Sequence, residues 1–401
     1  MTGQYQWQGA LAAAKHAIDT EQIEAAESSL RIALTHIGTY EPKDPARLPI
    51  LAAFIRCCER AIELAEKNRP KPWHHIIAKT PADLATRRKL HPVLRHLRNH
   101  HFSANFMLLD SQVAQFGEGS ATVVETLLTL EQLEWTHPGH EDDSFALLRR
   151  ALAIRERTLG SEHPDTIEVV WRLASRYDTY SSYGWAIPLW QWLLAHVEHN
   201  GPLDFGRARY DVPELLLLLG KAYNGLRSYE EAKKVWKRYL KLTEDEPQQL
   251  DSRLPLVVMR RLSVYYSIGH ACLAQEEWAE AAGFLARATE SHRTMRGFTV
   301  RLEDGPSGIN LSSGIAAYAQ ALSRSDRQDE AIPLFEEAIT LNYNIDHQYA
   351  ELLRDYATAL RAAGDTAKAV TVGDEAAALL ESIEAKKRRR DAITVALPDL
   401  E

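Results

Sequence analysis

A pattern of small and large residues recurs along the chain at helical spacing, and it restricts the possible folds more than any other feature. The clearest copy starts at Pro213, where small Gly220 lies on one predicted helix. A short turn, GLRS, leads to a second helix that carries Ala232 and the bulky Trp236. A small residue on each helix allows close approach, and the large aromatic side chain fills the space between hairpins. The pattern therefore predicts an antiparallel helical hairpin.

The same register recurs in four further segments, which begin at Ile167, Leu262, Ser312 and Ala350. Two weaker copies precede them, one near Glu125 and one at the start of the chain, where Ala14 and Ala17 precede Ile23 and Ala26. The intervening run LPILAAFIRCCERAIELAEKN predicts another amphipathic helix, which fits no register. Since a single hairpin cannot bury its apolar stripe alone, the copies predict a stack of hairpins with a continuous core.

The phrase ALAIRERTLGSEHPDT, Ala151 to Thr166, resembles the tetratricopeptide repeat family, and more narrowly the long repeats of kinesin light chains. Within it Gly160 suits a helix C-cap and Pro164 a stop, after which Asp165 or Thr166 can cap the next helix. The resemblance implies an all-α, right-handed solenoid whose first helices line a groove that binds proteins or peptides. Later repeat spacings are irregular, which requires insertions, most clearly at residues 296–314.

Composition agrees with this interpretation. Glycine and proline are sparse for 401 residues, and a hydrophobic content of 45% is ample for a continuous core. Three cysteines are too few for a disulfide framework and include no CxxC pair. No signal peptide is apparent, and no apolar run approaches the ~20 residues that span a bilayer. We therefore expect a cytoplasmic protein.

Four segments are predicted. Degenerate hairpins occupy residues 1–68, and a basic, histidine-rich insertion of irregular or helical structure occupies residues 69–120. The repeat solenoid covers residues 121–380, and a basic helix end with a C-terminal tail covers residues 381–401. The run KKRRR, Lys386 to Arg390, would complement the negative end of a helix dipole.

The family register also predicts which side chains face the groove. They are Trp171, Arg172, Lys221, Asn224, Tyr266, His270, Gln320, Arg324, Arg354 and Arg361. Five of these ten are cations and none is acidic, although the chain carries a net charge of −8. Arginine grips carboxylates in a bidentate manner and amide side chains bond to a peptide backbone. The set predicts a site for an acidic peptide segment of a partner protein. The alternative interpretation is that these residues lie on ordinary solvated helix faces, since acidic neighbours such as Asp355 occur at their margins.

Two other functions remain open. One is a regulatory protein that senses a small signalling peptide. The other is a subunit that associates with nucleic acid through a basic patch of Arg87, Arg88, Lys89, Arg95 and Arg98. No recognised nucleic-acid-binding motif accompanies this patch, and its packing against an acidic part of the protein or a partner is the favoured interpretation.

Metal, cofactor and catalytic sites are not predicted. His96 and His100 share a helix face at the spacing of a metal-binding pair, but no third ligand is apparent nearby in the sequence. Phosphate-binding glycine loops, nucleophile elbows and the HExxH motif are all missing. We expect a binding protein without enzymatic activity.

Overall fold

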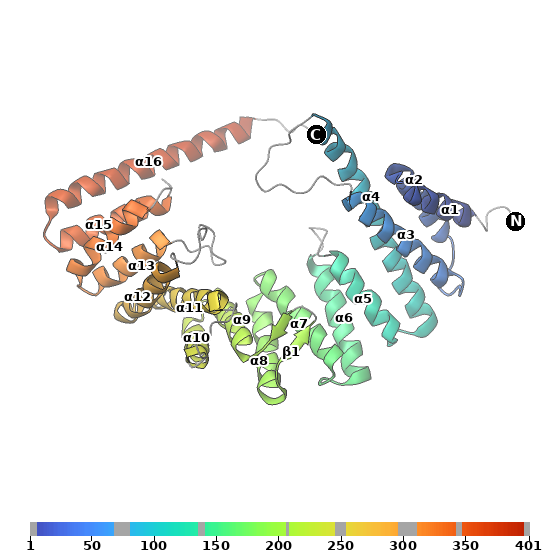
Figure 1. The fold of residues 1–401 in the computed structure, drawn as a ribbon, viewed down its shortest axis with the longest axis horizontal. Coiled ribbons are helices and arrows are strands. Elements are labelled where there is room, and N and C mark those ends of the chain that lie inside the picture. The colour runs from blue at the N-terminus through green and yellow to red at the C-terminus, as the bar shows by residue number, and fades with distance from the viewer. Residues whose placement is uncertain are drawn as a thin grey trace. The chain divides into compact units, whose positions relative to one another are not determined.

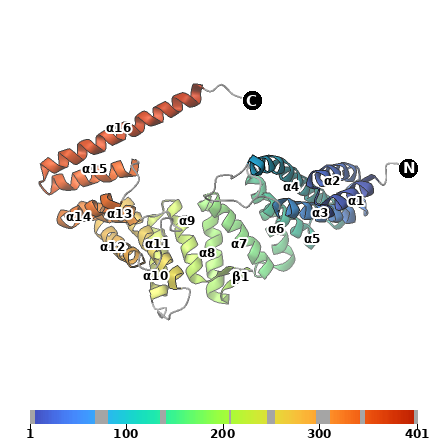
Figure 2. The ribbon, with the colours of Figure 1, turned by 45° about the horizontal axis from the view of Figure 1, so that its top comes forward.

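The computed structural model describes residues 6–67, 81–134, 141–205, 208–244, 254–295, 311–341 and 347–396. The chain divides into two compact units, Met1–Tyr180 and Ser181–Glu401. Helices dominate both units, as Figures 1 and 2 show, and the predicted all-α class is confirmed. None of the described helices is both long and apolar enough to cross a membrane.

Helices of the first unit pair in chain order. They are α1 (Gln6–Asp19), α2 (Ile23–Ile37), α3 (Arg47–Lys67), α4 (Pro81–Phe116), α5 (Ala121–Glu134), α6 (Glu141–Leu159) and α7 (Pro164–Thr179). Helix α1 packs on α2, α3 on α4 and α5 on α6. The helix that fitted no register is α3, and its partner is the long α4, so the part of the histidine-rich region from Pro81 to Phe116 forms the second helix of a hairpin.

The second unit continues the series. Its helices are α8 (Tyr183–Asn200), α9 (Val212–Gly225), α10 (Tyr229–Glu244), α11 (Leu254–Ala274), α12 (Trp278–Met295), α13 (Leu311–Arg324), α14 (Gln328–Leu341), α15 (His347–Ala362) and α16 (Thr366–Ala396). A short antiparallel hairpin of β1 (Leu203–Phe205) and β2 (Ala208–Tyr210) separates α8 from α9. The pairs α9/α10, α11/α12, α13/α14 and α15/α16 each form a hairpin, and these are the predicted copies from Pro213 onward.

Glycines on the first helices make room for large side chains on the second. A Cβ atom at Gly220 would lie 2.2 Å from Nε1 of Trp236, and one at Gly269 would lie 2.6 Å from Cγ of Leu285. Both large side chains are buried. The small–large pairing seen in the sequence is therefore the contact that closes each hairpin, and the prediction of stacked helical hairpins is confirmed.

One turn geometry recurs in five hairpins. Three residues join the helices in each, and the middle one has a positive φ: Glu21 (58°), Arg227 (58°), Glu276 (61°), Asp326 (60°) and Gly364 (92°). The left-handed region costs a residue with a side chain roughly 1 kcal/mol. The repetition of one costly conformation at one position supports a shared register independently of the packing.

We expect the Arg227→Gly variant to be more stable than the wild type by about 0.5 kcal/mol. Glycine removes the left-handed strain, and the greater entropy of the unfolded chain cancels only part of that gain. The matched change, Gly364→Ala, introduces the strain and is expected to cost about 1 kcal/mol. Urea unfolding followed by circular dichroism measures both effects, and stabilisation by Gly364→Ala would contradict the assigned turn.

At the junction between α6 and α7, the structure confirms the predicted C-cap but not the predicted N-cap. Helix α6 ends at Leu159 and Gly160 follows with φ 87°, so the predicted C-cap is confirmed. Neither Asp165 nor Thr166 is the next N-cap, because α7 begins at Pro164 and His163 caps it, its Nδ1 accepting from the Asp165 N–H at 3.2 Å. Proline fits the first position of a helix because it has no N–H to satisfy. The cap therefore moves to the preceding residue, and Pro164 starts a helix instead of stopping one.

Two boundaries also differ from expectation. Helix α16 runs to Ala396, so the basic run from Lys386 lies inside it and does not mark its end. Helix α13 begins at Leu311, inside the predicted insertion of residues 296–314. Residues 296–310 and 397–401 lie outside the described part of the chain.

Candidate functional site

The first helices of the second unit, α9, α11, α13 and α15, carry most of the predicted groove residues, and we call their common surface the first-helix face. Helix α13 contacts both α11 and α15. Arg260 of α11 forms a 2.7 Å ion pair with Glu214 of α9. The four helices therefore lie in one row, and a single extended ligand can reach side chains from several of them.

Helix α15 places two arginines on this face. Arg354 and Arg361 are exposed, and their side chains form no ion pair or hydrogen bond with the described residues. They lie seven positions apart, about two helical turns or roughly 10 Å along the axis, with exposed Thr358 between them. Each guanidinium group presents a planar fork of N–H donors that matches a carboxylate. We call them the arginine pair.

Helix α13 contributes a polar group beside the arginine pair. The Gln320 side chain donates from Nε2 to Oδ2 of Asp355 over 3.2 Å. Burial raises the pKa of the Asp355 carboxyl, an effect that the positive charges of Arg354 and Arg324 partly offset. The Arg324 guanidinium also lies 5.7 Å from the ring centroid of Trp278. The structure thus brings Gln320, Arg324 and Arg354 together around one half-buried carboxylate.

Three other predicted groove residues lie on α9 and α11, the first two helices of the row. Lys221 and Asn224 are exposed on α9, and His270 is exposed on α11. Lys221 already interacts with a neighbouring group. The role of these side chains in binding stays a prediction.

Tyr266 is not available to a ligand, and its prediction as a groove residue is wrong. Its side chain is only 1% exposed. The hydroxyl lies 3.2 Å from Nδ1 of His292, and a Cβ at Gly314 of α13 would meet the ring. The glycine at the start of α13 allows this tyrosine to pack between successive hairpins, which the repeat register could not reveal.

Trp171 and Arg172 belong to the first unit and lie in a different setting. Trp171 is half-buried. Arg172 forms a 2.7 Å ion pair with Glu168 and lies 3.9 Å from Glu131, which is buried and also pairs with Arg176. Arg172 is therefore part of an internal network that joins α5 to α7, and its charge is already compensated.

In the described part of the basic segment, Arg98 and His101 face acidic side chains of α3. Arg98 forms a 2.7 Å ion pair with Glu66 of α3, and His101 lies 3.7 Å from Glu59. Burial lowers the pKa of His101. Arg95 is exposed, and the side chains of Arg87, Arg88 and Lys89 lie outside the described residues. These contacts agree with the interpretation that the segment packs against an acidic part of the protein.

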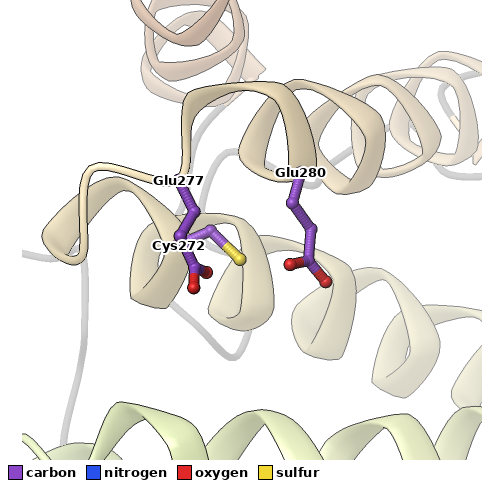
Figure 3. A group of neighbouring side chains, drawn as sticks. All are labelled: Cys272, Glu277 and Glu280. Carbon is purple, nitrogen blue, oxygen red and sulfur yellow. The ribbon is translucent and has the colours of Figure 1, made fainter.

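Cys272 of α11, Glu277 of the turn that follows it and Glu280 of α12 form a compact group, shown in Figure 3. Their potential ligand atoms lie within 4.8 Å of one another. Glu277, however, pairs with buried Lys233 at 2.5 Å, and Glu280 pairs with Lys237 at 2.6 Å. Burial raises the pKa of the Cys272 thiol to about 12, whereas a metal ligand must be a thiolate. The group is therefore explained by ion pairs that join two hairpins.

Sequence reasoning noted Asp355 only as an acidic neighbour of the groove and missed its bond to Gln320. The half-exposed Trp278 ring beside Arg324 was not among the predicted groove residues either. Both roles depend on contacts between successive hairpins. No signal within a single repeat could have revealed them.

Comparison with known families identifies one repeat directly. Residues 139–165, which include all of α6 and its C-cap, match the tetratricopeptide repeat family. The predicted resemblance to this family is confirmed. No curated protein sequence matches the chain.

Several solved structures resemble the fold. The repeats of a putative kinesin light chain from Podosopora anserina are 19% identical, with a TM-score of 0.39, over 57% of this chain and 99% of that one. A STAND protein with a tetratricopeptide repeat sensor from Pyrococcus horikoshii is 12% identical, with a TM-score of 0.47, over 94% of this chain and 54% of that one. A Rap protein complexed with competence and sporulation factor is 10% identical, with a TM-score of 0.33, over 95% and 99% of the two chains. At these levels of similarity, function has to be argued from the side chains of this protein.

Proposed function

We propose that this chain, which contains a tetratricopeptide repeat, is a protein-binding scaffold that holds an acidic, extended segment of a partner on the first-helix face. The observation that carries the proposal is the arginine pair. Arg354 and Arg361 are exposed and form no ion pair with the described residues, in a protein whose net charge is −8. Most other cations discussed above, such as Arg98 and Arg172, already have carboxylate partners.

The spacing of the arginine pair specifies the ligand further. The two residues are separated by roughly 10 Å along α15. A polyproline II segment repeats every three residues and rises about 9.3 Å over that distance. Acidic side chains three positions apart in such a segment would therefore meet both guanidinium groups, while Gln320 and Thr358 can bond to its backbone.

A peptide titration tests this proposal. The ligand is a fluorescein-labelled peptide with glutamate at every third position and serine or proline between, and its glutamine counterpart serves as the neutral probe. We expect the Arg354→Glu, Arg361→Glu variant to bind the acidic peptide at least about 100-fold more weakly, because each charged hydrogen bond contributes about 1.5–3 kcal/mol. Fluorescence anisotropy at physiological salt gives the dissociation constants.

The control variant is Lys234→Glu, Lys241→Glu, which makes the same change in net charge on exposed positions of α10. Its effect should be small, since charges beyond the Debye length of about 8 Å are screened. Equal losses in both variants would show that the effect comes from net charge and would contradict a specific site.

The two alternatives predict different results. A peptide-sensing protein would become more compact when the acidic peptide is added, which small-angle scattering detects. A nucleic-acid-associated subunit would bind single or double strands with strong salt dependence and lose that affinity when Arg88 and Arg95 are reversed. The described contacts of the basic segment weaken the second alternative, because Arg98 is already paired.

A further inference from the structure

Helix α4 carries a histidine pair that the proposed function does not use. His96 and His100 lie four positions apart, so their side chains share one face of the helix. The sequence near them offers no third ligand. The structure supplies one from α2, because that helix packs against α4.

Glu27 of α2 lies between the two histidines. Its Oε1 atom is 3.0 Å from Nε2 of His100 and 3.8 Å from Nδ1 of His96. The glutamate and His100 are 73 positions apart in the sequence, which is why pattern reasoning missed the group. Two imidazoles and one carboxylate form a ligand set that zinc uses in open, three-ligand sites.

The two separations that involve Glu27 are close to those that zinc requires. Zinc–nitrogen and zinc–oxygen bonds of about 2.0–2.1 Å at tetrahedral angles place neighbouring donor atoms roughly 3.3 Å apart. The observed separations of 3.0 and 3.8 Å lie on either side of that value. Because His96 is exposed and lies four positions from His100 on the same helix face, rotation of its side chain is the step that brings the second imidazole nitrogen to the ion.

The exposure of the three side chains is consistent with a metal site at the protein surface. Glu27 and His100 are 12% and 15% exposed, so the hairpins hold them in place. His96 is 53% exposed and leaves one side open to solvent. A tetrahedral ion held here keeps a fourth position for water or for a ligand from another molecule.

We propose that His96, His100 and Glu27 form a binding site for a divalent transition-metal ion of the zinc type, which links α2 to α4. Its binding requires the unprotonated imidazole nitrogens and the ionised carboxylate, so the ion competes with protons for the site. The Cys272 group is the location that the test must exclude, because its three potential ligand atoms lie within 4.8 Å of one another.

The test is calorimetric titration of the full chain, freed of metal with a chelator, with zinc chloride, and visible spectroscopy with cobalt(II) as a second probe. We expect one ion per chain and tetrahedral cobalt bands. The His96→Ala, His100→Ala variant should bind zinc at least about 100-fold more weakly, since the loss of outer-shell partners alone costs 10–100-fold. His16→Ala, His199→Ala, which removes two exposed histidines elsewhere, should bind as the wild type does.

The Glu27→Gln variant distinguishes the loss of a metal ligand from a folding defect. Glutamine preserves the shape of the side chain and a hydrogen bond to His100, but it is a poor zinc ligand. Circular dichroism confirms that the variants keep their helices. Undiminished zinc binding by Glu27→Gln or by the double histidine variant would overturn the proposal. So would the absence of one-to-one binding to the wild type, or a loss of binding in Cys272→Ser alone, which would place the ion at the hairpin of α11 and α12.

Discussion

Replacing Trp236 with alanine is expected to lower the free energy of unfolding of the second unit by about 3–5 kcal/mol. The indole is buried between α9 and α10, and truncation of a large core side chain removes its burial and leaves a cavity. Because the chain has two units, the lost stability should be measured in the second unit alone. Hydrogen exchange of the α9 and α10 amides, followed by mass spectrometry, provides that measurement.

A double-mutant cycle with Gly220 makes this prediction specific. In the wild type, Gly220→Ala should cost about 1–3 kcal/mol, because the new Cβ would lie 2.2 Å from the indole nitrogen. In the Trp236→Ala background the clash is gone, and alanine should stabilise the helix by up to about 1 kcal/mol. If Gly220→Ala has the same sign in both backgrounds, the pairing of small and large residues does not close the hairpin.

Replacing Glu131 with alanine is expected to destabilise the first unit by about 3–5 kcal/mol. The Glu131 side chain is only 3% exposed, and it pairs with Arg176 and faces Arg172. Removal of one partner from a buried ion pair leaves uncompensated charge in the interior. Hydrogen exchange of the α5 and α7 amides measures the loss.

Glu118 provides the matched control. It forms a 3.1 Å ion pair with Arg150 but is 65% exposed, so Glu118→Ala should cost no more than about 1 kcal/mol. A similar cost for both variants would mean that the Glu131 network contributes no more than a surface pair. It would also reopen the interpretation of Arg172 as a residue that is free to bind a partner.

The fold could be predicted from the sequence because each hairpin repeats the same local requirement. Gly220 with Trp236 and Gly269 with Leu285 are contacts within one hairpin, and their spacing is visible along the chain. Gly160 could be recognised as a C-cap because few other residues adopt its positive φ readily. These features depend on neighbours within about 40 residues.

Features that depend on contacts between hairpins could not be predicted. Tyr266 occupies a register position that points outward in an ideal repeat, but Gly314 of the next hairpin receives its ring. The third candidate ligand for His96 and His100 comes from α2. Periodicity within a repeat carries no information about which residue the next hairpin offers, so these positions required the structure.

We propose the arginine pair as the partner-binding surface of a protein scaffold. Its most direct test is affinity purification of the tagged protein from its native cells, with co-purifying proteins quantified by mass spectrometry. Wild type is compared with the Lys221→Glu, Arg354→Glu, Arg361→Glu variant and with the α10 control, all of unchanged helicity. We expect a stoichiometric partner that co-purifies with the wild type and with the α10 control but is lost from the Lys221→Glu, Arg354→Glu, Arg361→Glu variant. A partner retained at full level by that variant would contradict the claim and place the binding surface elsewhere.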